Sequence, residues 1–184
     1  WVKSFNRIPT ETPVTARLLC FHWAGGNGMA FRPWSLLFAP VGIDVLAMHC
    51  PGRLQRSKEP LVNNIPDILQ GFLDSDIPLL FFGHSLGGII AFELTKYIEE
   101  HHTHHPSALC HLVLSSINSP SVLLHKYADP ASDEPKKHLL GDEQFIADMN
   151  ALGGTEGVAP ELIKMALPIM RADFTALETF RPQP

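Results

Sequence analysis

The chain has 184 residues, of which 45% are hydrophobic and 18% are charged, and its formal net charge is −5. This length and composition predict one folded domain with a sizeable core. Because Lys and Arg form no cluster, we do not expect nucleic acid as a partner. No apolar run reaches the roughly 18 residues that span a bilayer, so we expect no membrane partner either.

Apolar segments alternate with helical patterns over the first two thirds of the chain. The predicted strands cover residues 17–22, 43–48, 79–82 and 109–114, and the helices cover 31–38, a segment starting at 65–69, and 85–100. Strands that alternate with helices form right-handed βαβ crossovers. We therefore predict an α/β fold with a mainly parallel sheet, helices on both faces, and catalytic groups at the carboxyl ends of the strands.

The pattern changes after Pro120. Residues 120–180 contain no clear strand, and helices are predicted over 142–149, 162–165 and 169–180. We interpret residues 1–119 as the N-terminal part of the α/β core, 120–180 as a helical lid, and 181–184 as the start of a return to the core. The alternative for the second segment is an ordinary helical subdomain with no gating role.

The sequence Gly83-His84-Ser85-Leu86-Gly87 follows the strand predicted at 79–82 and opens a helix. Strand, G-x-S-x-G, then helix is the context that a nucleophile elbow requires. The two outer glycines allow strand and helix to approach closely, which exposes the Ser85 hydroxyl at the top of the sheet. The alternative is a Ser/Gly-rich turn without a chemical role, which the apolar strand and the small residues at the helix start disfavour.

A serine nucleophile also needs donors for the oxyanion. In this arrangement one donor is the backbone N–H of the residue after the serine, here Leu86, and the other comes from the loop after an early strand. That loop is His22-Trp23-Ala24-Gly25-Gly26, and the N–H of Ala24 is our candidate. A glycine-rich turn without a ligand role is the alternative.

Cysteine and histidine usage is uninformative about chemistry. Cys20, Cys50 and Cys110 are far apart and lie in or beside apolar runs, which predicts buried free thiols in a reducing cytoplasm. The start of the chain has no signal-peptide pattern and no initiator Met, so a few residues are expected to precede it. The tract 101–105 holds four histidines but matches no zinc spacing, and we expect a solvated loop and no metal.

Five short motifs occur in order along the chain and together resemble one family. They are Phe21-His22-Trp23-Ala24-Gly25-Gly26, Pro51-Gly52-Arg53 with Glu59-Pro60, Gly83-His84-Ser85-Leu86-Gly87, Leu152-Gly153-Gly154-Thr155 and Arg171-Ala172-Asp173-Phe174. The chain resembles the type II thioesterases, stand-alone α/β-hydrolases that work beside nonribosomal peptide, polyketide and fatty acid synthases. The resemblance runs from about Arg17 to Phe180.

The resemblance implies the α/β-hydrolase fold and hydrolysis of acyl groups from the phosphopantetheine arm of a carrier protein. It implies Ser85 as the nucleophile, and the N–H groups of Leu86 and Ala24 as the oxyanion hole. It implies no cofactor besides the phosphopantetheine of the substrate. The expected partner is an acyl or peptidyl carrier protein of a synthase, and we expect a cytoplasmic monomer.

The family's catalytic acid and base follow its lid, in a Gly-Asp-x-Asp-like turn and a Gly-Gly-His loop, and neither motif is present in these residues. We therefore expect the acid and the base histidine to lie beyond Pro184, with the closing strands and last helix of the fold, which would leave an apolar sheet edge. The histidines within the chain are disfavoured as bases. His84 belongs to the elbow, the 101–105 tract is roughly 24 Å away along the helix, and His125 and His138 lie in the lid.

Two other functions stay open from the sequence. A general carboxylesterase or lipase could share this fold, and a non-catalytic hydrolase-fold module would need no acid or base. The basic residues Arg53, Arg56 and Lys58 could meet an acidic carrier protein, although we interpret them as solvated loop charges.

Overall fold

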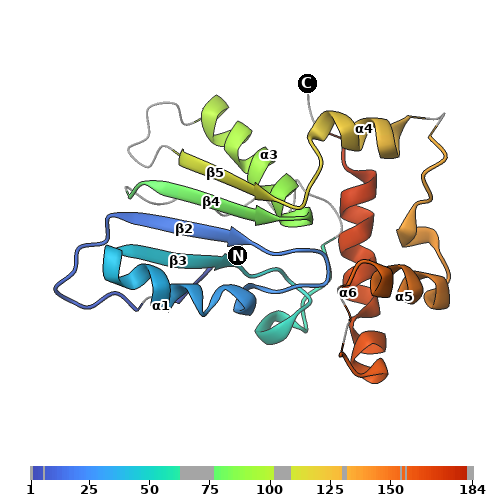
Figure 1. Cartoon of the computed structure of the whole chain (residues 1–184), viewed down its shortest axis with the longest axis horizontal. Helices are drawn as coiled ribbons and strands as arrows, with labels where there is room; N and C mark the ends of the chain where they lie inside the picture. The colour runs from blue at the N-terminus through green and yellow to red at the C-terminus, as the bar shows by residue number, and fades with distance from the viewer. Residues whose placement is uncertain are drawn as a thin grey trace.

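The computed structural model describes residues 2–5, 7–62, 77–101, 109–129, 132–153, 155 and 157–181. Its described strands form one sheet in the order β1-β3-β2-β4-β5 (Figure 1). The strands are β1 (Val2–Ser4), β2 (Ala16–Phe21), β3 (Ile43–Met48), β4 (Leu79–His84) and β5 (Leu109–Ser115). β1 pairs antiparallel with β3, and all other neighbours are parallel. The predicted α/β fold and its four parallel strands are therefore confirmed, and the short β1 is an addition.

Side chains of the central strands alternate between two cores. In β2, Leu19 and Phe21 pack with the helix α3 (Leu86–His101) on one face of the sheet. Leu18 and Cys20 pack on the other face, with Phe31 and the short helix α1 (Trp34–Phe38). This period of two places a layer of helix on each side, and it buries the central strands on both faces.

A helical cap lies beyond the carboxyl ends of the strands (Figure 1). It comprises α4 (Pro120–Ala128), the short η4 (Lys137–Leu139), α5 (Asp142–Ala151) and α6 (Pro160–Thr179). Helix α5 packs on α6 through a third core, whose buried members are Phe145, Met149, Ile163, Leu167, Met170 and Phe174. The cap thus has its own core. Helix α6 also contributes Leu177 to the core between the sheet and α3.

The prediction of separate helices at 162–165 and 169–180 is wrong, because α6 is one helix with Pro168 inside it. A proline in a helix interior costs about 3 kcal/mol. The helix nevertheless continues because Ile163 and Leu167 before the proline, and Met170 and Phe174 after it, bury one continuous face.

The predicted helix at 31–38 is also divided. It forms η1 (Gly28–Phe31) and then α1, which begins after Pro33. The proline has no backbone N–H to continue a helix through it, but it suits a helix start. The helix predicted from residue 65 and most of the histidine tract, residues 102–105, lie outside the described residues.

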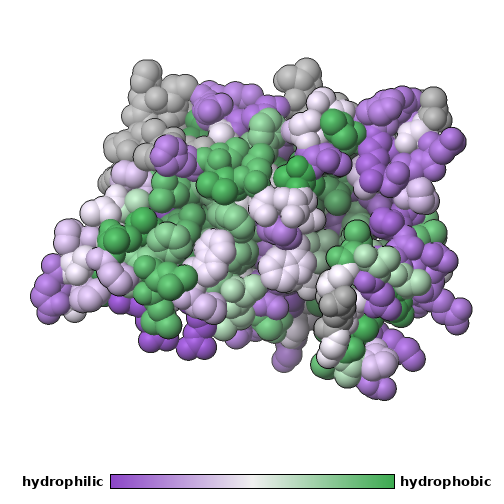
Figure 2. Space-filling view, viewed as in Figure 1, coloured by the Kyte–Doolittle hydropathy of each residue, from purple (hydrophilic) through white to green (hydrophobic). Residues whose placement is uncertain are grey.

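Hydrophobic surface gathers over β5 and over α1 (Figure 2). On β5, which is an edge among the described strands, Val113 is 52% exposed and Leu114 is 44% exposed, and Leu36 and Leu37 of α1 are more exposed still. An exposed apolar edge of this kind can pair with a further strand, in agreement with the closing strands that the sequence analysis expects beyond Pro184. None of the described helices combines the length and apolarity needed to cross a membrane.

Candidate active site

Ser85 sits on a sharp turn between β4 and α3. Its φ is +54°, in the left-handed region that a residue with a side chain rarely adopts. Ser85 N–H donates to the backbone oxygen of Ser115 at the end of β5 (2.9 Å), and Ser85 O accepts from Gly88 N–H (2.8 Å). The strained conformation is therefore fixed from both sides, which is the geometry of a nucleophile elbow.

Glycines at two positions make this turn possible. A Cβ on Gly83 would lie 2.3 Å from the backbone oxygen of Gly87, and a Cβ on Gly87 would lie 2.2 Å from the backbone oxygen of Phe21. Both contacts are far shorter than atoms tolerate. The first turn of α3 is thus packed directly against β4 and against the end of β2.

The same close approach brings the elbow beside the loop that follows β2. The Cβ position of Gly87 is 2.7 Å from the backbone oxygen of His22, the first residue of that loop. Leu86, the first residue of α3, has an N–H with no partner inside the helix, and the helix dipole adds positive potential there. The two predicted sources of oxyanion donors therefore lie side by side.

Hydrogen bonds within the loop occupy the amides of the two glycines that follow Ala24. Gly25 N–H donates to Asp173 Oδ2 (2.7 Å), and Gly26 N–H donates to the backbone oxygen of Trp23 (2.9 Å). Among the described residues, nothing accepts from the N–H of Ala24. The N–H of Trp23 likewise has no acceptor in the described part of the chain, so the predicted donor Ala24 is one of two loop amides that these hydrogen bonds leave available.

Arg53 is buried, so its interpretation as a solvated loop charge is wrong. It lies in the loop after β3 and pairs with Asp173 of α6 through Nη2–Oδ1 (2.7 Å) and Nη1–Oδ2 (3.1 Å). The desolvation penalty of each charge requires such a partner. Arg56 instead pairs with Glu59 at the surface.

Sequence reasoning missed the Arg53–Asp173 pair, although both residues stand in quoted motifs. A usable signal was available on α6. Asp173 lies beside Met170 and Phe174 on the apolar side of the helix, and a carboxylate on a buried helix face must find a cation. The sequence did not indicate which Arg or Lys supplies it, because Arg53 is 120 residues away.

The described histidine side chains near the elbow have other partners. His84 Nδ1 lies 3.0 Å from Ser115 Oγ, and the His84 ring makes an edge contact with Trp23. His22 is buried, and burial first, then the neighbouring Arg53 charge, lower its pKa to about 4. Neutral His22 donates from Nδ1 to the backbone oxygen of Trp23 (2.9 Å), because that partner is only an acceptor.

His138 belongs to a separate structural contact in the cap. Its Nδ1 is 2.5 Å from Glu178 Oε2, and the same carboxylate accepts from the backbone N–H groups of Lys137 and His138. Glu178 is fully buried. The contact therefore joins η4 to the C-terminal turns of α6.

Burial raises the pKa of Cys20 and of Cys50 to about 12, which makes both thiols inert at neutral pH. Among the described residues, no three His, Cys, Asp or Glu side chains are arranged to hold a metal ion.

A parallel sheet with a strained serine between strand and helix, beside a glycine loop with a free amide, defines an α/β-hydrolase. The chain belongs to the thioesterase domain family, whose model matches residues 16–184.

Known proteins agree with this assignment. The chain is 33% identical over 187 residues to the gramicidin S biosynthesis protein GrsT of Aneurinibacillus migulanus, covering 97% of this chain and 68% of that protein. It is 31% identical to the human medium-chain S-acyl fatty acid synthase thioesterase, covering 95% and 66%. The structure of the type II thioesterase BorB from the borrelidin biosynthetic cluster superposes with a TM-score of 0.76 and 29% identity, covering 100% of this chain and 72% of that one.

The chain spans 48% to 68% of the length of five curated relatives that it matches. These matches establish the family.

Proposed function

We propose that the protein is a thioesterase that hydrolyses acyl groups from the phosphopantetheine arm of a synthase carrier protein. One observation carries the proposal: Ser85 is held at φ +54° beside two backbone amides, those of Leu86 and Ala24. Family membership supplies the substrate class, because relatives such as GrsT and the human enzyme are named for peptide and fatty acid synthesis.

The chemistry begins with attack of Ser85 Oγ on the thioester carbonyl carbon, while a general base takes the hydroxyl proton. The carbonyl oxygen becomes an oxyanion that accepts from the N–H groups of Leu86 and Ala24. The C–S bond then breaks, the thiol leaves with the proton, and an acyl ester remains on Ser85. Water, deprotonated by the same base, hydrolyses this ester and restores the hydroxyl. No cofactor or metal takes part in these steps.

The general base is not assigned to a described histidine. His84 and His138 have the contacts given above, and His22 is buried away from solvent with its Nδ1 engaged. An acid and a base histidine beyond Pro184 stay a prediction from the sequence. The carrier-protein partner, the monomeric state and the cytoplasmic location are likewise parts of this proposal.

Residues 120–180 are proposed to act as a lid over the acyl site. The cap lies beyond the carboxyl ends of the strands, which is the end where Ser85 stands (Figure 1). Within the cap, α6 is fixed to the sheet loops by the buried Arg53–Asp173 pair. Helix α6 is therefore the fixed wall of the proposed lid, and α5 and η4 are attached to it through the third core and through Glu178.

The test uses the natural full-length product, with an acyl-phosphopantetheinyl carrier protein as substrate. Wild type is expected to release the acyl group and, on rapid quenching, to carry the mass of one acyl group on Ser85. Ser85→Ala is expected to form no such adduct and to lose at least about 10³-fold in kcat. A persistent acyl adduct in Ser85→Ala would refute the assignment of the nucleophile.

A substrate panel separates the proposal from a general carboxylesterase. Matched acyl groups are offered as carrier thioesters and as simple alkyl esters, and kcat/KM is compared. A preference for the carrier thioester supports the proposal, and a preference for the simple esters overturns it. A full-length product that hydrolyses neither would leave only the fold and favour a binding module.

A further inference from the structure

One buried ion pair connects the cap to the loops at the end of the sheet. The side chains of Arg53 and Asp173 are 5% and 4% exposed, and both guanidinium nitrogens Nη1 and Nη2 face the carboxylate. A buried pair of this kind seldom stabilises a fold more than apolar side chains of the same volume would. We therefore consider which neighbouring segment the pair holds in place.

The remaining hydrogen bonds of the pair all go to the loop after β2. Asp173 Oδ2 accepts from Gly25 N–H (2.7 Å), and Arg53 Nη1 donates to the backbone oxygen of Gly26 (2.8 Å). The pair thus holds one polar group of each of the two residues that follow Ala24. The preceding peptide, which carries the N–H of Ala24, is held through its carbonyl, Trp23 O, by Gly26 N–H, so the pair acts on this peptide through the two glycines.

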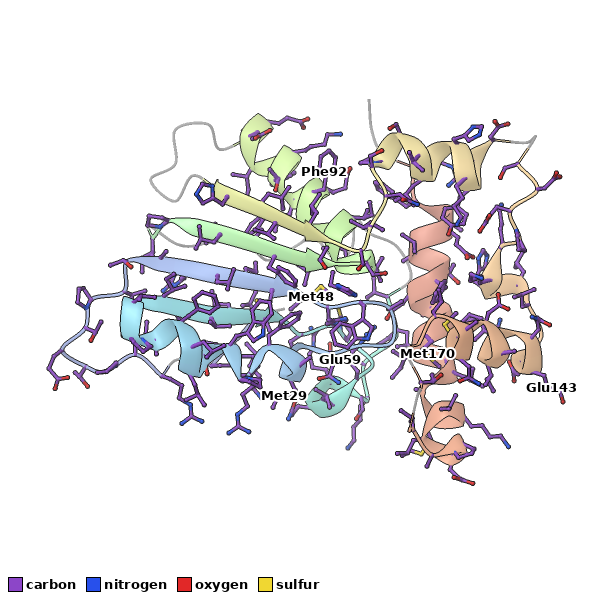
Figure 3. The ribbon with its side chains drawn as sticks, in the orientation of Figure 1. Met29, Met48, Glu59, Phe92, Glu143 and Met170 are labelled. Atoms are coloured by element: carbon purple, nitrogen blue, oxygen red, sulfur yellow. The ribbon has the colours of Figure 1, made fainter. Side chains whose placement is uncertain are left out.

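Apolar contact from the same helix reinforces the arrangement. Met170, one turn before Asp173, lies on the side of α6 that faces the loop (Figure 3). A Cβ on Gly25 would be 2.6 Å from Met170 Cγ, and Gly25 has φ +77°. Without these contacts a loop with two consecutive glycines would have many backbone conformations of similar energy.

We propose that Arg53 and Asp173 are positioning residues that set the Ala24 N–H in the oxyanion hole, with α6 as their support. This inference rests on the proposed function. Displacing a catalytic group by about 1 Å can reduce the rate by about 10²-fold. A loop with two consecutive glycines therefore needs contacts, such as those of this ion pair, that hold its backbone in one conformation. The pair acts on the transition state through Ala24 and does not itself touch the substrate.

The test is Asp173→Asn in the natural full-length product. Asparagine keeps the shape of the side chain but has only one acceptor oxygen, so it cannot accept from Gly25 N–H and from both Arg53 nitrogens as the carboxylate does, and the charge partner of Arg53 is lost. We expect kcat for the acyl-carrier thioester to fall by about 10- to 100-fold while KM changes by less than about threefold. Loss of a donor used only in the transition state lowers kcat and kcat/KM together.

Glu178→Gln is the matched control. Glu178 is also a buried carboxylate of α6, five residues further along, but it accepts from Lys137 and His138 of η4 and not from the loop. Both variants are expected to lower the melting temperature, whereas Glu178→Gln keeps kcat within about threefold of wild type. An equal loss of kcat in the two variants would overturn the proposal, because it would mark a general effect of instability.

Arg53→Lys provides the same test should Asp173→Asn fail to fold. Lysine keeps the charge, but one ammonium group cannot replace the planar fork that binds both carboxylate oxygens and Gly26 O. The same loss of kcat at constant KM is expected. Unchanged kcat refutes the positioning role and leaves the proposed function intact as long as Ser85→Ala is inactive. Equal activity of wild type and Ser85→Ala refutes the proposed function itself.

Discussion

Replacing Gly87 by alanine has two opposing effects on the stability of the folded protein, and they differ in size. Gly87 lies in the first turn of α3, where a helical backbone is compatible with any residue, and alanine at a helical position is about 1 kcal/mol more favourable than glycine. Helix propensity alone therefore predicts a more stable protein. The packing predicts the opposite, because the new Cβ would lie 2.2 Å from the backbone oxygen of Phe21 and 2.5 Å from its carbonyl carbon.

The steric effect is the larger one. Relief of these contacts requires α3 and the end of β2 to separate by roughly 1 Å, and the obstructing atoms are buried backbone that no rotamer change can move. Overpacking that side chains can absorb costs about 1–3 kcal/mol, so we expect about 3–5 kcal/mol here. After the gain in propensity, the net loss is about 2–4 kcal/mol, which corresponds to a decrease in Tm of roughly 5–15 °C for a chain of this size.

The assay is urea and thermal unfolding of Gly87→Ala beside Gly88→Ala. The control changes the next position of the same helix and gains the same propensity, but its Cβ would meet Cγ2 of Ile117 at 2.7 Å, the end of a side chain that can move. We expect Gly88→Ala to stay within about 1 kcal/mol of wild type. Equal stability of the two variants would contradict the account of the elbow as a backbone-to-backbone contact.

Further predictions concern ionisation. The unfolded chain binds a proton at His22 below about pH 6.5, whereas the folded protein binds it only near pH 4, so His22 lowers the free energy of unfolding by about 3 kcal/mol as the pH falls across this window. Urea titrations should show this slope, and His22→Gln should flatten it; equal slopes would contradict the buried neutral ring. Cys20 and Cys50 should resist iodoacetamide at pH 8 in the folded protein and react in urea, as followed by peptide mass mapping, and rapid labelling of either thiol in the folded state would contradict the pKa of about 12.

Elements with a local signal could be predicted from the sequence. β4 is an apolar run that ends in Gly83-His84-Ser85, and its turn requires glycine at positions that the motif itself specifies. Local signals failed where tertiary packing outweighs them. Pro168 indicates a helix end, but the buried face on both sides of it keeps α6 continuous.

In the candidate site, too, residues with a local signal could be predicted and residues placed by long-range contacts could not. Ser85 and Leu86 follow from one short motif, whereas the loop after β2 offers several amides, and the choice of Ala24 among them had no support from a contact. The structure excludes Gly25, because its N–H donates to Asp173, 148 residues away. No periodicity or spacing reports a contact of that separation, so the role of Arg53 could not be inferred either.

The separation of these contacts along the chain has a consequence for the order of events during synthesis. Ser85 and its elbow are complete within the first 119 residues. Arg53, in contrast, can form its ion pair only after Asp173 has been synthesised, 120 residues later. At about 5–20 residues per second, Asp173 leaves the ribosome roughly 5–20 s after Ser85. If the pair sets the oxyanion loop as proposed, a nascent chain carries Ser85 for some seconds beside a loop whose conformation is not yet set. The full catalytic rate is therefore possible only after the last described helix has docked on the loop.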